Sequence, residues 1–194
     1  MRTPETKSEI KEWLSKFSSE EYEVKLAYSI FFILHTRFLF ELGPKVALAI
    51  KNSDIIANSE QHKRITELLM LSSLMLIIDR MYEAFENNTQ YANGINAYIL
   101  DAVSSICGFD KQYLYELVKM FRENQSGEII EITNRIDDIL ETRFSSFGIN
   151  LAKLYVQDMS KIAMDTLLIS ISWDEEEMMD KLTNELCKTY GIVE

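Results

Sequence analysis

The sequence predicts an all-α fold, a single compact bundle of about eight or nine helices over residues 1–194. Its 194 residues include only 6 Gly and 2 Pro, the residue types that tight turns between strands require. Apolar side chains recur at the three- and four-residue spacing of helices, and no stretch alternates as a half-buried strand does. A hydrophobic content of 47%, with 26% charged residues, is enough to build one core.

The predicted helices follow one another along the whole chain, and capping boxes mark three of their starts. In a capping box, a Ser or Thr and a Glu three positions later bond reciprocally to exposed N–H groups of the helix start. The three pairs are Thr6 with Glu9, Ser18 with Glu21, and Ser172 with Glu175. Gly108 and Gly191 fall where a left-handed residue ends a helix, and Gly43-Pro44 is expected to end another. The expected ranges are 3–17, 18–42, 44–50, 59–85, 91–106, 110–122, 128–144, 149–170 and 172–190.

Two of these helices, over about 19–42 and 59–86, are expected to lie buried at the centre of the bundle. The first is apolar over most of its circumference, and in the second the run Leu68–Ile78 must avoid water on nearly every side. The apolar run Leu26–Leu34 in the first is only nine residues long before polar residues interrupt it. A lipid bilayer requires about twenty, so we expect a core helix and not a membrane span.

The charge of the chain bears on the partners that it could bind. Net charge is −11, and residues 128–194 carry −8 of it, from 6 Lys+Arg and 14 Asp+Glu. Such a surface repels phosphate backbones, so no nucleic acid is expected, whereas a basic protein would be attracted.

Cysteine use and the start of the chain indicate a compartment. Cys107 and Cys187 belong to no metal-spaced set and are expected to be free thiols in a reducing environment. The first residues lack the apolar segment of a signal peptide. A cytoplasmic location is therefore expected.

The C-terminal segment, residues 172–194, has two possible roles. Its start is acidic, and its apolar seam is narrow and rich in Met, a residue that adapts to varied surfaces. It is expected to be either a peripheral helix on the bundle or a helix that binds a partner, which includes a second copy of the chain as a homodimer. The candidate partner-binding residues are Glu175, Glu176, Glu177, Met178, Met179, Leu182 and Leu186.

One stripe of carboxylates on the second central helix is a candidate metal site. Asp79, Glu83 and Glu86 lie within two turns on one side of that helix. Carboxylate oxygens are the ligands that Mg²⁺ and Mn²⁺ prefer, so the stripe could bind one of these ions. A solvated helix face is the alternative interpretation.

His35 and the start of the second central helix carry the other polar groups of interest. A catalytic histidine needs a nucleophile or an orienting carboxylate nearby, and neither lies at helical spacing from His35. We therefore expect a structural histidine, satisfied or half-exposed, with a ligand or a catalytic base as the alternative interpretation. Lys63, Arg64 and Glu67 are expected to mark an exposed polar side near the start of the second central helix.

The leading functional hypothesis is a non-enzymatic intracellular domain that presents its acidic C-terminal surface to a basic partner protein. An inhibitor, an immunity-like or antitoxin-like protein, or a regulator would fit. No Gly-rich phosphate loop and no nucleophile or zinc-protease motif is present, so we assign no catalytic residue and no cofactor. The alternative is a helical enzyme or ligand-binding bundle with a carboxylate-based divalent metal site.

Overall fold

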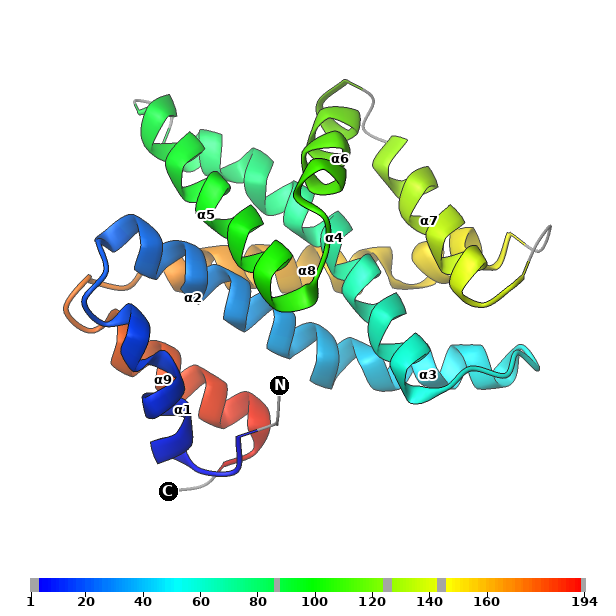
Figure 1. Cartoon of the computed structure of the whole chain (residues 1–194), viewed down its shortest axis with the longest axis horizontal. Helices are drawn as coiled ribbons and strands as arrows, with labels where there is room; N and C mark the ends of the chain where they lie inside the picture. The colour runs from blue at the N-terminus through cyan, green and yellow to red at the C-terminus, as the bar shows by residue number, and fades with distance from the viewer. Residues whose placement is uncertain (1–3, 86–87, 124–126, 143–145, 193–194) are drawn as a thin grey trace.

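The computed structural model describes residues 4–85, 88–123, 127–142 and 146–192. Within these ranges the fold is all-helical, as the sequence predicts, and nine α-helices pack into a bundle (Figure 1). They are α1 (Lys7–Leu14), α2 (Tyr22–Arg37), α3 (Gly43–Asn52), α4 (Ser59–Ala84), α5 (Thr89–Cys107), α6 (Lys111–Glu123), α7 (Gly127–Ile139), α8 (Phe147–Ile171) and α9 (Met178–Tyr190). A 3₁₀ turn, η1 (Ser15–Phe17), follows α1, and a π-helical turn, η2 (Phe38–Leu42), joins α2 to α3.

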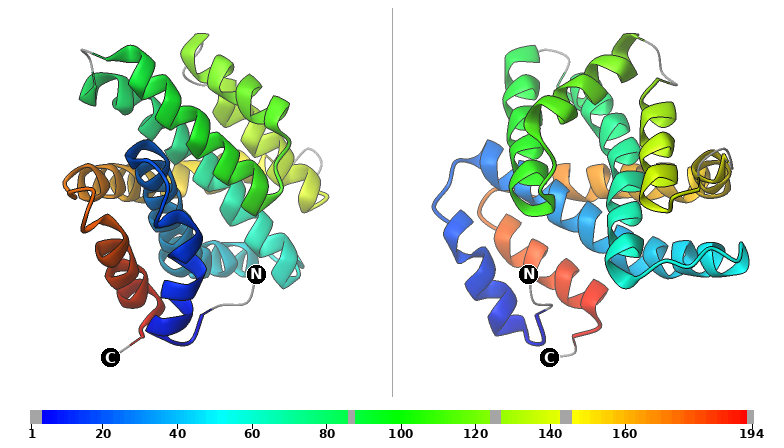
Figure 2. Two further views of the ribbon diagram at one scale, coloured as in Figure 1. Left: turned by 60° about the vertical axis from the view of Figure 1, so that its left-hand side comes forward. Right: turned by 45° about the vertical axis from the view of Figure 1, so that its right-hand side comes forward.

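Helix α2 lies at the centre of the bundle, where α5, α8 and α9 pack around it (Figure 2). Its apolar side chains point in every direction, and Leu26, Phe31 and Leu34 are all completely buried. Burial on all sides explains why this helix can be apolar around its circumference. The predicted central helix over about 19–42 is confirmed, although α2 itself begins later, at Tyr22.

Helix α4 is the second central helix, as predicted. A capping box of Asn58 with Gln61 starts it, and its apolar middle contacts α7 and α8 on one side and α5 on another. Leu68, Leu71 and Leu74 are buried in these contacts. The helix therefore crosses the bundle between layers that cover it from several directions.

The prediction that Gly43-Pro44 ends a helix is wrong, because α2, η2 and α3 form one continuous helical stretch. Proline lacks an N–H, and in an α-helix its ring collides with the carbonyl four residues earlier. The π-helical turn immediately before Pro44 widens the backbone, with the Gly43 N–H donating to the carbonyl of Phe38. This wider turn lets the helix pass through Pro44 without a break.

By length and composition, the continuous stretch Tyr22–Asn52 is the one helix among the described residues that could cross a membrane. It has 31 residues, and 61% of its most apolar window is buried inside the bundle. Apolar length is common to core helices and membrane spans. The prediction of a core helix is supported here by the packing of α5, α8 and α9 around α2.

Only the first of the three predicted capping boxes forms, at the start of α1. Ser18 and Ser172 instead turn back toward the preceding helix, and their hydroxyls donate to the carbonyls of Ser15 and Ile169 at 2.7 Å each. Each serine thus closes one helix and does not open the next. As a result, α2 and α9 begin several residues after the predicted positions.

Helices α7 and α8 approach each other so closely that their contact requires a glycine. A Cβ built at Gly148 would lie 2.3 Å from the carbonyl oxygen of Thr133, well inside van der Waals contact. The Gly148 N–H donates to Oδ1 of Asp137 at 2.8 Å, so a side chain of α7 caps the start of α8. One close approach and one cap therefore join these two helices.

Replacing Gly148 by Ala should destabilise the protein by about 1–3 kcal/mol, because the added methyl group pushes α8 away from Thr133. Gly94→Ala on α5 is the matched control, since a Cβ there meets nothing within 4 Å. This control should stabilise the helix by about 0.5–1 kcal/mol. Urea unfolding followed by circular dichroism measures both changes, and equal midpoints for the two variants would contradict the close approach.

Candidate functional site

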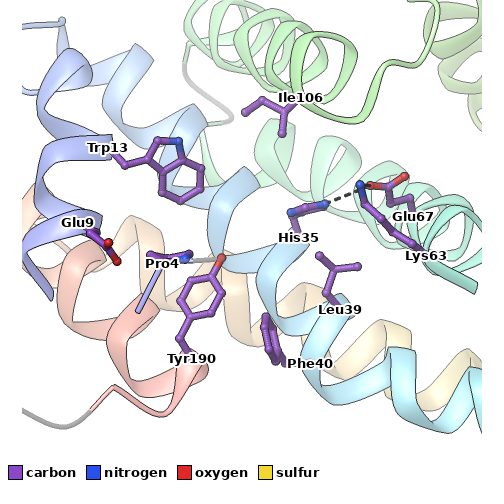
Figure 3. A pocket seen from close by; sticks show the side chains of 10 residues that line it. All are labelled: Pro4, Glu9, Trp13, His35, Leu39, Phe40, Lys63, Glu67, Ile106 and Tyr190. Carbon is purple, nitrogen blue, oxygen red and sulfur yellow. Dashed lines mark hydrogen bonds and ion pairs between the residues drawn. The ribbon is translucent and has the colours of Figure 1, made fainter. Parts of the chain in front are cut away.

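A pocket of about 420 Å³ opens between α1 and α9 on one side and α2, η2 and α4 on the other (Figure 3). That volume suits a small molecule. The residues that line it are Pro4, Glu9, Trp13, His35, Leu39, Phe40, Lys63, Glu67, Ile106 and Tyr190.

Aromatic rings form the outer wall of the pocket. The Phe40 ring from η2 meets the Tyr190 ring from α9 edge to face, with 5.0 Å between centroids. Trp13 from α1 packs on Phe32 of α2 at 4.5 Å, and its Nε1 is buried with no hydrogen-bond partner among the described residues. Burial of an unpaired donor costs free energy.

Two polar residues of the inner wall, His35 of α2 and Glu67 of α4, form a cluster with Cys107, which follows the lining residue Ile106 at the end of α5. Their ligand atoms all lie within 4.8 Å of one another. His35 Nε2 lies 3.4 Å from Glu67 Oε1, and the Figure 3 close-up draws this contact beside the pocket. We call these three residues the His–Glu–Cys cluster.

Helical periodicity does not predict this cluster, because its members lie on different helices. The expectation that Glu67 lies on an exposed face is wrong, since only 4% of the residue is exposed. No carboxylate lies at helical spacing from His35 on α2, but Glu67 of α4 places one beside its ring. The His35 ring also stacks on the Phe31 ring, with 5.4 Å between their centroids. One available signal was that Glu67 directly precedes Leu68–Ile78, where the apolar run leaves no exposed face.

Two cations lie near the Glu67 carboxylate without bonding closely to it. Its oxygens are 3.7 Å from Lys63 Nζ and 3.6 Å from Arg64 Nη1, both longer than a hydrogen bond. Arg64 is engaged elsewhere, because it donates to the carbonyl of Cys107 at 2.9 Å and lies 3.8 Å from the centre of the Phe109 ring. The cations therefore stabilise the carboxylate through space and leave room beside its oxygens.

Burial, and then the negative charge of Glu67, raise the pKa of the Cys107 thiol to about 12, although Lys63 and Arg64 act in the opposite direction. The thiol is therefore protonated at neutral pH. A protonated thiol is a poor nucleophile, so the cluster is not a ready-made cysteine–histidine catalytic pair.

The predicted carboxylate stripe lies elsewhere on α4. Glu83 is exposed and forms an ion pair with Arg80 three residues earlier, whereas Asp79 borders a separate cavity of about 290 Å³. Glu86 lies outside the described residues. The metal site at Asp79, Glu83 and Glu86 stays a prediction.

The predicted partner-binding residues of the C-terminal segment divide into two groups. Met178, Leu182 and Leu186 are completely buried, because α9 packs this seam against α1 and α2. Those side chains already face their own chain, as in a peripheral helix. Met179 is half-buried, and Glu175, Glu176 and Glu177 are exposed in the turn before α9, where a partner could reach them.

The structure brings these exposed acids close to others from the start of α2. Lys25 Nζ lies 3.3 Å from Glu175 Oε1, which ties the two segments together. Burial, followed by the charges of Glu175, Asp174 and Glu23, raises the pKa of Tyr22. We call this surface the acidic end, and its residues are Glu20, Glu21, Glu23, Asp174, Glu175, Glu176 and Glu177.

Cys107 should react slowly with iodoacetamide, with a rate still rising above pH 9, because its pKa is raised to about 12. A Cys187→Ser background leaves Cys107 as the one cysteine, and a chelator removes stray metal. Glu67→Gln removes a negative charge that disfavours the thiolate, so alkylation should accelerate several-fold. Lys63→Gln should slow it. A rate that levels off near pH 8.5 in the folded protein would contradict the raised pKa.

No protein-family model, no curated protein and no solved structure matches this chain. No activity can therefore be carried over from a relative.

Proposed function

We propose that the protein is a helical binding domain for a small molecule with a flat apolar body and an acidic group. The pocket between α1, α2, α4 and α9 carries this proposal. Its volume of about 420 Å³ lies in the range of small-molecule sites, which are mostly apolar with a few converging polar groups.

The two ends of the pocket suit the two parts of such a molecule. Phe40, Tyr190 and Trp13 offer ring faces and edges for a flat apolar body. At the other end Lys63 offers an ammonium group that is 48% exposed and only loosely paired with Glu67. An acidic group on the ligand would find its counter-charge there.

The dye 8-anilinonaphthalene-1-sulfonate, an aromatic body with a sulfonate, is a suitable probe. Its fluorescence should rise and shift to the blue in a saturable manner, with one site per chain. Phe40→Glu should weaken binding by about tenfold, equal to 1.4 kcal/mol, because it places a like charge at the pocket wall. Lys63→Gln should weaken it several-fold.

Leu168→Glu on α8 is the matched control, since Leu168 is 57% exposed and Phe40 is 44% exposed, and both lose an apolar side chain. This control should leave dye binding unchanged. Near-ultraviolet circular dichroism confirms that each variant keeps fixed packing, because loosely packed states also bind the dye. Equal affinity for wild type and Phe40→Glu would refute the pocket as the binding site.

A second candidate function, the binding of a basic partner protein, is favoured by the acidic end. Two segments far apart in the sequence contribute to this surface, and Lys25 is a basic side chain in contact with it. A dense acidic surface speeds the association of a basic protein and makes the affinity fall with salt. In this proposal the exposed acids of the turn before α9, and not its buried seam, would contact the partner.

Affinity purification from the source cells with quantitative mass spectrometry tests this second candidate. A triple Glu→Gln variant at Glu175, Glu176 and Glu177 should lose a basic partner that the wild type retains at low salt. The matched control replaces three other exposed glutamates, Glu12, Glu116 and Glu123, by Gln. If both triple variants lose the same proteins, the binding depends on net charge alone and the acidic end is not the site.

A further inference from the structure

We infer that the His–Glu–Cys cluster binds a divalent transition-metal ion, Zn²⁺ by its chemistry, at the inner wall of the pocket. His35, Glu67 and Cys107 offer one ligand atom each, and these atoms lie within 4.8 Å of one another. The inference goes beyond the small-molecule pocket and does not depend on it. A metal could bind whether or not an organic ligand does.

The donor set selects the class of metal. An imidazole nitrogen, a thiolate sulfur and a carboxylate oxygen are the three ligand types that Zn²⁺ takes in proteins. Mg²⁺ and Mn²⁺ prefer oxygen donors and gain little from a thiolate. The cluster therefore favours Zn²⁺, whereas Mg²⁺ or Mn²⁺ is predicted at Asp79, Glu83 and Glu86.

The geometry is close to that of a tetrahedral site. Donor atoms around a tetrahedral zinc ion lie about 3.3–3.6 Å apart, so a separation of 4.8 Å must close by about 1.2–1.5 Å. His35 Nε2 and Glu67 Oε1 already lie 3.4 Å apart. Cys107 is the last residue of α5, before the left-handed Gly108, so its side chain can shift without breaking a helical turn.

The Glu67 carboxylate is the strongest single reason to expect a cation here. Its side chain is only 5% exposed, yet both of its cationic neighbours stand beyond hydrogen-bond distance. The Cys107 thiol donates to this carboxylate, and His35 Nε2 lies 3.4 Å from Oε1. A carboxylate has about four lone-pair sites, so a metal ion held among the three side chains would replace these weak contacts by direct bonds. Two protein anions, Glu67 and the Cys107 thiolate, would then balance the charge of the ion.

The positive charges of Lys63 and Arg64, which lie near the Glu67 carboxylate, oppose the binding of a metal cation. Lys63 is 48% exposed, so its ammonium can move into water when the ion enters. Arg64 stays bonded to the carbonyl of Cys107. Removing the charge of Lys63 should therefore tighten metal binding, an effect that a variant with damaged folding would not produce.

Metal binding releases one proton from the protein. The Cys107 thiol loses its proton to the buffer as the sulfur–metal bond forms, and no group changes its oxidation state. The three protein ligands leave a fourth position that water, or a donor atom of a molecule in the pocket, would occupy. Zinc sites with an open fourth position are those that exchange ligands.

Equilibrium dialysis with Zn²⁺ measures the stoichiometry, and Co²⁺ reports the sulfur ligand through its thiolate charge-transfer absorption. We expect one ion per chain and a thiolate band in the wild type. Cys107→Ser should abolish the band, and His35→Gln should weaken binding by at least about tenfold. Glu67→Gln should weaken binding but keep the band, whereas Lys63→Gln should tighten binding several-fold.

The chain supplies its own controls, because it holds 2 Cys and 2 His. Cys187→Ser and His62→Ala should leave both the stoichiometry and the band unchanged. In the wild type, Zn²⁺ should also protect Cys107 from alkylation, a measurement that requires no variant. Absence of bound metal in the wild type, a band that survives Cys107→Ser, or a band lost in Cys187→Ser would each overturn the inference.

Discussion

The structure depends on keeping α2 and α4 out of water, since both helices are apolar on nearly every side over much of their length. Other helices must cover them from several directions, and α5, α8 and α9 do so for α2. The few polar groups on these two helices are enclosed by the same packing. His35 of α2 and Glu67 of α4 lie where these two helices meet, and His35 Nε2 is 3.4 Å from Glu67 Oε1.

Enclosure in this way makes the His–Glu–Cys cluster chemically distinct from the surface charges. Ion pairs between two exposed side chains, such as Lys45 with Asp158 and Lys119 with Glu123, contribute little to stability. Glu67 is instead buried among an imidazole, a thiol and two cations, where the local dielectric is low and every charge acts on its neighbours. Burial and the charge of Glu67 raise the pKa of the Cys107 thiol, and the two other residues of the cluster, His35 and Glu67, line the pocket.

Sequence patterns predicted the elements of this fold better than its contacts. Apolar periodicity located the two central helices, and Gly108 and Gly191 do end α5 and α9 in the left-handed conformation. Local capping patterns failed at Ser18 and Ser172, because a serine can close one helix as readily as it opens another. The pocket and the cluster were not predictable, since periodicity along one helix carries no information about which other helix it faces.

Helices α1 and α9 complete the pocket, with Trp13 from α1 and Tyr190 from α9 in its wall. Helix α1 packs directly on α9, although the two are separated by almost the whole described chain (Figure 2). During synthesis on the ribosome, α1 emerges long before its neighbour exists. One side of α2 thus stays uncovered until translation reaches α9, so the nascent chain forms this pocket only after α9 has been made.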